Sequence, residues 1–211
     1  MRVDTFDIFI EKLRQSFLTP DKPGAIVQET MAPTYKKFIP IKQPLVEAAV
    51  LVLFYPINNL PHFVLIKRTP DDFSPHGGQV SLPGGRYENS DKDYLYTALR
   101  ETSEEVGISI SSITVLGALT PLIVPVSGFH VHPFVGYLFN SPQWSINSHE
   151  VSYLIEVPLS ELTNPNNVNS ETILFEGNNH QIPYFRLVGE KVWGATAMIL
   201  AELKAIVQRA L

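Results

Sequence analysis

Residues 84–108 read GGRYENSDKDYLYTALRETSEEVGI, and the interpretation of the whole chain starts from this stretch. Small and apolar side chains recur in it at spacings of three and four, which predicts an amphipathic helix with one buried face. That face comprises Leu95, Ala98, Leu99, Thr102 and Val106. We expect Asp91 and Asp93 to open the helix, because carboxylates suit the positive end of the helix dipole. Gly107 is expected to end it.

Three carboxylates, those of Glu101, Glu104 and Glu105, fall within five residues near the end of this helix. Residues three and four apart are neighbours on a helix, so these groups lie on one side and repel each other. A divalent cation among them would relieve the repulsion, and all-oxygen ligation suits Mg²⁺ or Mn²⁺ rather than Zn²⁺. A solvated acidic face is the alternative that the three glutamates alone leave open.

The stretch resembles the signature of the Nudix hydrolases, G-x5-E-x7-R-E-U-x-E-E-x-G-U, in which U is a bulky apolar residue. Gly85 matches the first glycine. The second half matches in register at Arg100, Glu101, Glu104, Glu105, Gly107 and Ile108. Asp91 stands at the first Glu position, the gap from Asp91 to Arg100 is one residue longer, and Thr102 replaces the apolar residue. Asp91 and the longer gap both occur in the coenzyme A pyrophosphatase branch of that family.

Residues 65–85 resemble the upstream motif of the same branch, L-L-T-x-R-[SA]-x3-R-x3-G-x3-F-P-G-G. The matching or nearly matching residues are Leu65, Arg68, Thr69, Gly78, Pro83, Gly84 and Gly85. The segment after Arg68 is one residue longer than the motif, its second Arg is absent near residues 72–74, and Leu82 replaces Phe. Further on, Ser127-Gly128-Phe129 followed by residues 131–136 resembles a loop and strand of that branch.

The resemblance implies a set of metal ligands. Glu101 and Glu105 are expected to be the paired ligands of Mg²⁺ or Mn²⁺, and Glu104 is expected to join a further ion. The Gly85 carbonyl could complete a coordination shell, since glycine lets the backbone approach closely. Arg100 cannot bind a cation and is expected to orient a neighbouring glutamate, with a surface ion pair as the alternative.

The resemblance also implies substrate-binding residues. Arg68 is expected to bind a substrate phosphate beside Gly84 and Gly85. Phe129 is expected to stack on an adenine or line a pantetheine channel, and packing into the core is an equal alternative.

The general base is expected on a late loop. Glu150 is the first candidate, and His130 and His149 are the other two.

The activity implied by the resemblance is metal-dependent hydrolysis of the diphosphate bond of coenzyme A or its derivatives. The products would be 3′,5′-ADP and 4′-phosphopantetheine or its acyl form. Another nucleoside diphosphate derivative, such as ADP-ribose or a dinucleotide, is the alternative substrate. A Nudix domain that senses nucleotides without cleaving them is a third reading, but such domains usually lose catalytic glutamates and all three remain here.

Composition excludes several classes of protein. The net charge of −5 argues against non-specific nucleic-acid binding, which needs a basic surface. The absence of cysteine excludes disulfides and thiolate metal sites. Apolar runs fall short of a membrane span, and the acidic N-terminal segment does not resemble a signal peptide, so we expect a cytoplasmic protein with no membrane partner.

The expected fold class is α/β. By the resemblance it is the Nudix fold, an α/β/α sandwich around a mixed β-sheet, over residues 45–211. Strands are predicted at 46–55, 63–67, 79–82, 112–125, 131–139 and 153–157, with a hairpin over 172–187 and a C-terminal helix after residue 194. Residues 1–44 are predicted to hold a helix at 4–18 and an extended, proline-rich arm. This segment is expected to pack on the domain or on a second subunit of a homodimer.

Overall fold

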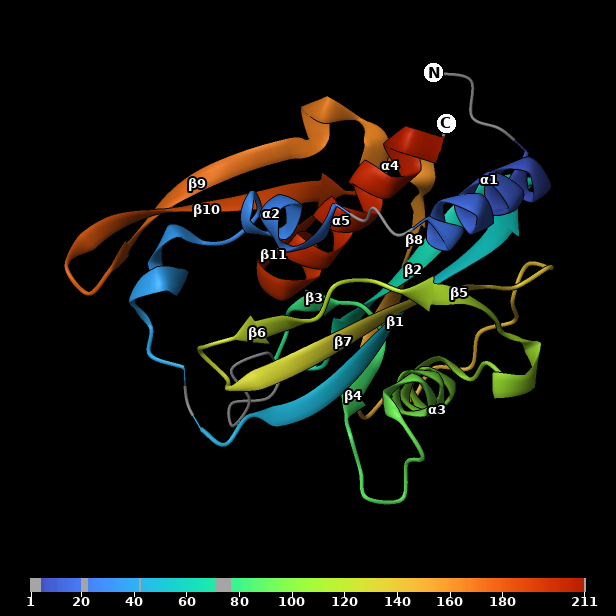
Figure 1. Ribbon diagram of the computed structural model, residues 1–211, viewed down its shortest axis with the longest axis horizontal. Helices are drawn as coiled ribbons and strands as arrows, with labels where there is room; N and C mark the ends of the chain where they lie inside the picture. Colours follow the sequence, from blue (N-terminus) through green and yellow to red (C-terminus); the bar gives the residue numbers. More distant parts are fainter. Residues whose placement is uncertain (1–4, 20–22, 42, 71–76, 211) are drawn as a thin grey trace.

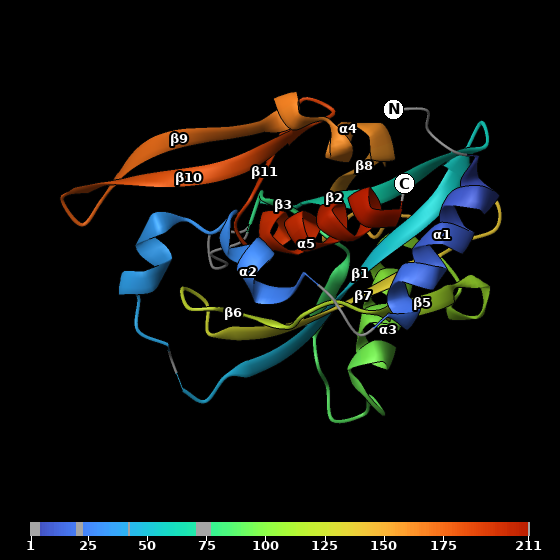
Figure 2. The ribbon, with the colours of Figure 1, turned by 45° about the horizontal axis from the view of Figure 1, so that its top comes forward.

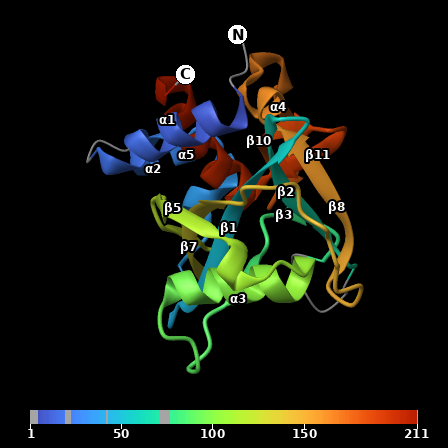
Figure 3. The same ribbon diagram turned by 90° about the vertical axis from the view of Figure 1, so that its right-hand side faces the viewer.

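The computed structural model describes residues 5–19, 23–41, 43–70 and 77–210. Part of the loop predicted before residue 78, including residues 72–74, therefore lies outside the described residues. Three layers are visible in Figure 3: helix α3 covers one face of a central sheet, and helices α1 and α5 cover the other. The predicted α/β/α sandwich around a mixed sheet is confirmed.

The central sheet is organised around one long apolar strand, β1. Its eight strands are β1 (Val46–Ile57), β2 (Leu60–Arg68), β3 (Val80–Ser81), β4 (Gly84–Arg86), β5 (Thr114–Ala118), β6 (Leu122–Val124), β7 (Phe129–Tyr137) and β8 (Val151–Pro158). β1 pairs with β7 in parallel and with β2 and β4 antiparallel. The short strand β4 was not predicted, because its Gly-Gly-Arg sequence carries no strand pattern.

Alternate residues of β1 enter two different cores, as expected for a strand buried on both faces. Ala49, Leu51 and Leu53 pack with Ala98 and Val106 of α3. Val52 and Phe54 instead join a larger core with α1 and α5. The sheet therefore separates an α3 side from an α5 side (Figure 1).

The helix predicted from the opening stretch is α3 (Tyr94–Val106). Its N-cap is Asp93, whose carboxylate accepts a hydrogen bond from the Tyr96 backbone N–H at 2.7 Å. Gly107 ends it in the left-handed conformation, at φ 76°. Asp91 lies before the helix and not in its first turn, so that part of the expectation was wrong; Asp91 is buried and binds Arg100 instead.

Helix α1 (Phe6–Leu18) agrees with the prediction and buries Phe6, Phe9 and Leu13 in the larger core. The following arm is not extended as predicted. It folds into α2 (Gly24–Glu29) and a 3-10 helix, η1 (Thr34–Phe38), and Pro23 and Pro33 stand just before these turns, where they do not interrupt them.

A buried polar network ties α2 to α5 (Gly194–Ala210). The Gln28 side-chain amide donates to Glu202 Oε2 at 2.8 Å and to the Thr120 carbonyl at 2.7 Å. Thr120 donates to Glu202 through its backbone N–H at 3.0 Å and its hydroxyl at 2.7 Å. The carboxylate of Glu202, which is fully buried, thus has partners on both of its oxygens.

A second antiparallel sheet extends past α2 (Figure 2). It consists of β9 (Val168–Phe175), β10 (Asn178–Leu187) and β11 (Glu190–Trp193). The β9–β10 hairpin was predicted, whereas β11 was not. Short helices complete the chain: η2 (Ile110–Ser112), α4 (Leu159–Thr163) and η3 (Pro165–Asn167). Across the described residues, every helix is too short or too polar to traverse a lipid bilayer.

The N-cap of α3 leads to a prediction about stability. Asp93→Ala removes the acceptor of the Tyr96 N–H and should lower the free energy of unfolding by about 1 kcal/mol. Asp93→Asn keeps an oxygen acceptor and should retain most of the stability. Urea unfolding of both variants measures this, and equal losses for alanine and asparagine would contradict the capping role.

Candidate active site

A cleft of about 870 Å³ opens beside α3 at the start of β4. Residues of α3, β4, the arm and the start of α5 all line it, together with Glu150 just before β8. The cleft brings together seven of the residues singled out in the sequence: Arg68, Gly84, Gly85, Glu101, Glu105, Phe129 and Glu150. Its volume lies in the range of small-molecule sites.

Glu105 is the most buried of the three glutamates, with only 1 % of its side chain exposed. Its Oε2 accepts a hydrogen bond from the Gly84 backbone N–H at 2.8 Å, and its Oε1 lies 3.3 Å from Arg68 Nη1. Burial raises the pKa of Glu105 to about 8, against the opposing effects of Gly84 and Arg68. Burial disfavours the free carboxylate, so the Glu105 carboxyl favours binding either a proton or a cation.

Glu101 lies one helical turn before Glu105 and is 14 % exposed. Its carboxylate sits directly over the Cα of Gly85, where any Cβ would overlap it. Burial raises the pKa of Glu101, while the Arg100 guanidinium lowers it. The neighbouring Gly84 adopts φ 148°, and its Cα approaches the backbone of β1 too closely for a side chain.

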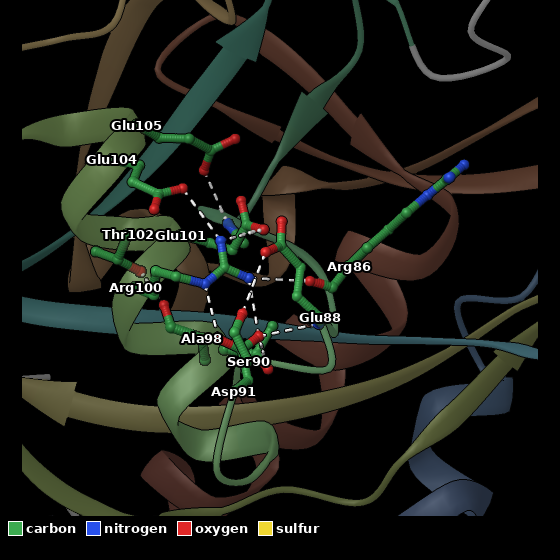
Figure 4. Close-up of polar contacts among 12 residues, drawn as sticks. Arg86, Glu88, Ser90, Asp91, Ala98, Arg100, Glu101, Thr102, Glu104 and Glu105 are labelled. Atoms are coloured by element: carbon green, nitrogen blue, oxygen red, sulfur yellow. Dashed lines mark hydrogen bonds and ion pairs between the residues drawn. The ribbon is translucent and has the colours of Figure 1, made fainter.

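Arg100 is surrounded by three carboxylates (Figure 4). Its Nε and Nη2 donate to the two oxygens of Asp91 at 2.8 and 2.9 Å. Nη1 donates to Glu101 at 3.0 Å and to Glu104 at 3.1 Å. The hydrogen bonds from Arg100 hold the pKa of the buried Asp91 well below its usual range. This bidentate pair, with Asp91 fully buried, is not the surface ion pair considered as the alternative.

Glu104 differs from the other two glutamates. Its side chain is 54 % exposed, and the residue is not among those that line the cleft. The guanidinium of Arg100 links it to Glu101. Glu101 and Glu105 are thus the carboxylates that share the cleft.

Of the three candidates for a general base, Glu150 is the one that lines the cleft. Its negative charge contributes to raising the pKa of both Glu101 and Glu105, so the three carboxylates interact electrostatically. The Asn147 side-chain amide donates to Glu150 at 3.0 Å and orients it. His149 and His130 are not among the lining residues, and His130 lies beside Glu47.

Phe129 both packs against the larger core and lines the cleft, so the two expectations for it are compatible. The Arg86 guanidinium lies over its ring, 5.3 Å from the centroid. Apolar side chains of β6, β7 and α5 also line the cleft. Val131 belongs to the segment 131–136 that resembles the family branch, whereas Leu122, Val124, Met198 and Ile199 were not predicted to belong to the site.

The donors in this cleft fit a hard divalent cation. Glu101 and Glu105 offer carboxylate oxygens from one face of one helix, beside the backbone of Gly85. Burial disfavours their ionised forms, and a bound dication would offset that penalty. No imidazole lines the cleft within the part of the chain that the structure describes, which favours oxygen-preferring ions.

Two polar features escaped sequence reasoning. One is the burial of Asp91, which its position in a polar stretch does not reveal. The other is a cluster of Glu47, His130 and His132 on the α3 side of the sheet. The signal that could have found it is the spacing of the two histidines, which are alternate residues of one strand and therefore share a face.

Comparison with known proteins places the chain in a family. The family model described as NUDIX domain matches residues 46–176, more than half of the chain. A protein named "Uncharacterized Nudix hydrolase NudL" from Yersinia pestis (strain Pestoides F) is 39 % identical over 157 residues, which cover 74 % of this chain and 77 % of that protein. The protein of the same name from Yersinia pseudotuberculosis serotype O:1b (strain IP 31758) matches to the same extent.

Solved structures agree in fold. The crystal structure of a Nudix hydrolase from M. smegmatis, RenU, superposes with a TM-score of 0.54 at 17 % identity, covering 78 % of this chain and 86 % of that one. The MutT protein from Methanosarcina mazei Go1 gives a TM-score of 0.50 at 14 % identity, covering 81 % and 96 %.

The close approach at Gly85 predicts a loss of activity in Gly85→Ala. The added methyl must displace the Glu101 carboxylate, and a misplacement of this kind can lower kcat/KM by about a hundredfold. Gly177→Ala is the control for a glycine outside the cleft lining: its φ of 77° disfavours alanine, but nothing lies within 4 Å of the added methyl, so it should lower stability and leave kcat/KM unchanged. Steady-state kinetics with a diphosphate substrate measure both variants. Wild-type kcat/KM in a folded Gly85→Ala protein would rule out a role for the Glu101 position.

The raised pKa of Glu105 predicts how the metal-free protein responds to pH. The folded-state pKa of about 8 exceeds the ordinary 4.5, so the folded state binds more protons between these values. Glu105 therefore contributes its full stabilisation below the ordinary pKa. The free energy of unfolding falls as pH rises toward about 8, because the buried carboxyl then loses its proton. Glu105→Gln should flatten this slope in urea unfolding with chelator present. A constant difference between variant and wild type across this pH window would contradict the assignment.

Proposed function

The chain belongs to the Nudix hydrolase family, whose members act on nucleoside diphosphate derivatives with divalent metal ions, and on that premise we propose that its substrate is coenzyme A or an acyl derivative. Hydrolysis of the diphosphate bond would release 3′,5′-ADP and 4′-phosphopantetheine or its acyl form.

One observation carries the proposal: the same cleft is lined both by a charged group and by an apolar group of side chains. The charged group contains Arg68, Glu101, Glu105 and Glu150. The apolar group comes from β6, β7 and α5. Coenzyme A has a matching division, because its diphosphate joins a charged nucleotide to a long, uncharged pantetheine chain. ADP-ribose and dinucleotides carry a second polar sugar where this chain would lie.

Glu101 and Glu105 are proposed to hold the divalent ion, with the Gly85 carbonyl as a further ligand. The ion, when bound, neutralises diphosphate oxygens and lowers the pKa of water. The Gly84 N–H and Arg68 fix the orientation of the Glu105 carboxylate. Arg100 positions Glu101: its guanidinium is held by hydrogen bonds to Asp91 and donates a further hydrogen bond to the Glu101 carboxylate. Glu104 is proposed to contribute to a further ion, for which its side chain would have to leave Arg100.

Glu150 is proposed as the general base. The attacking water gives its proton to the Glu150 carboxylate, its oxygen bonds to one phosphorus, and the bridging oxygen leaves with the other phosphate. Phe129, together with the Arg86 guanidinium that lies over it, is proposed to contact the adenine or the start of the pantetheine chain. The Asn147 hydrogen bond would keep Glu150 turned toward the cleft.

A substrate panel with product identification tests the proposal. Coenzyme A, an acyl-coenzyme A, ADP-ribose and a diadenosine polyphosphate are compared with Mg²⁺ and with Mn²⁺. We expect the highest kcat/KM for coenzyme A or its acyl form, with 3′,5′-ADP as a product. Turnover of ADP-ribose well above that of coenzyme A would overturn the substrate and support the alternative.

Glu105→Gln provides the control for chemistry. It keeps the shape of the side chain but removes a ligand charge, and should lower kcat by at least about a hundredfold. Asp93→Asn, which is remote from the cleft, should retain wild-type kcat. If folded Glu105→Gln protein turned over substrate at the wild-type rate, Glu105 would not be a metal ligand. The identity of the substrate would still be tested by the panel.

A further inference from the structure

Glu47 of β1 and the two histidines His130 and His132 of β7 form a second cluster of metal-binding side chains. The two strands run in parallel with Glu47 opposite His130 and Ala49 opposite His132, so all three side chains lie on one face of the sheet. One potential ligand atom from each residue lies within 4.8 Å of the others. Two imidazoles and one carboxylate are thus presented together by the two central strands.

Both imidazoles converge on the same carboxylate oxygen. His132 Nε2 lies 2.6 Å and His130 Nδ1 lies 3.1 Å from Glu47 Oε2. Ligand atoms around a tetrahedral Zn²⁺ stand about 3.3 Å apart, given Zn–N bonds of about 2.0–2.1 Å. An ion could therefore be inserted with only small outward rotations of these side chains.

The surroundings hold the rings in place. The Tyr94 ring, from the first residue of α3, stacks on His132 at 3.9 Å between centroids and an interplanar angle of 13°. The two imidazole rings pack against each other at 4.4 Å. The backbone of Glu47 is fixed by the strand and by a hydrogen bond from the Tyr87 N–H at 2.9 Å. The three side chains are half-buried, which leaves room for water as a further ligand.

The cluster is separate from the cleft. Glu47 shares the face of β1 that packs on α3, whereas Ala48 and Val50 line the cleft on the other face. Along β7, Phe129 and Val131 line the cleft, and His130 and His132 alternate with them. The cluster therefore shares no residue with the lining of the cleft.

We propose that Glu47, His130 and His132 bind a borderline divalent transition-metal ion, of which Zn²⁺ is the representative. Imidazole nitrogens suit Zn²⁺, Co²⁺ or Ni²⁺, whereas the oxygen-only cleft suits Mg²⁺ or Mn²⁺. The two sites therefore select different metals. Three protein ligands with a solvent-facing side match the pattern of an open site.

The test uses the full-length Glu101→Gln/Glu105→Gln protein, in which the cleft carboxylates no longer compete for metal. Chelator-treated protein is titrated with Zn²⁺ by isothermal calorimetry, and bound metal is counted by mass spectrometry. We expect one tightly bound Zn²⁺ and a rise in Tm on its addition. Adding His130→Gln and His132→Gln should weaken Zn²⁺ binding by at least about a hundredfold, because partners that merely orient a ligand already contribute about 10–100-fold.

His149→Gln in the same background is the matched control and should leave Zn²⁺ binding unchanged. X-ray absorption of the Zn²⁺-loaded protein supplies a readout that does not depend on folding of the histidine variants. Scattering from two imidazoles would support the site. Binding without imidazole scattering, or no stoichiometric Zn²⁺ at all, would reduce the cluster to hydrogen-bonded side chains and overturn the proposal. The activity of Glu105→Gln tests only the hydrolysis proposed for the cleft, and Zn²⁺ binding tests only the cluster of Glu47, His130 and His132. Either proposal can therefore be rejected without the other.

Discussion

The buried carboxylate of Glu105 is the constraint on which the geometry of the cleft depends. It reaches from α3 to the Gly84 N–H and so fastens the helix to β4. A buried carboxylate needs partners on its oxygens, and Gly84 and Arg68 supply them. The glycine pair answers two further steric limits: a side chain on Gly84 would meet the backbone of β1, and one on Gly85 would meet the Glu101 carboxylate. The Glu105 contact therefore adds a polar link between α3 and β4 to the apolar packing of α3 on β1.

Much of this arrangement could be predicted from the sequence. The apolar periodicity of α3, its Asp93 cap and its Gly107 stop are local signals, and the structure agrees with each of them. The apolar run of β1 likewise predicted a central strand, and the structure buries residues from both of its faces. Helical spacing placed Glu101 beside both Glu104 and Glu105, and the resemblance implied that Glu101 and Glu105 are the paired ligands. Local patterns of this kind are reliable because the interactions behind them span only a few residues.

The remaining features depend on contacts between distant segments. Asp91 looks like a helix-opening carboxylate, yet it is buried because Arg100 lies nine residues further along, where the helix brings it back over the loop. The arm looks extended from its prolines, yet α2 forms where α5 offers it a surface. β4 and β11 are strands only because neighbouring strands pair with them. The convergence of Glu47 with two histidines needs the register of β1 on β7, which no local pattern specifies.

The network of Gln28, Thr120 and Glu202 shows that the folded core needs residues outside the region of family similarity. The family match covers residues 46–176, whereas the fully buried Glu202 of the C-terminal helix lies after it and accepts a hydrogen bond from Gln28, which lies before it. A protein trimmed to residues 46–176 would lose both partners of this hydrogen bond, and the hydrophobic core would lose Phe6, Phe9 and the buried face of α5. The boundaries of the sequence match are therefore not boundaries at which the chain could be truncated and keep this core.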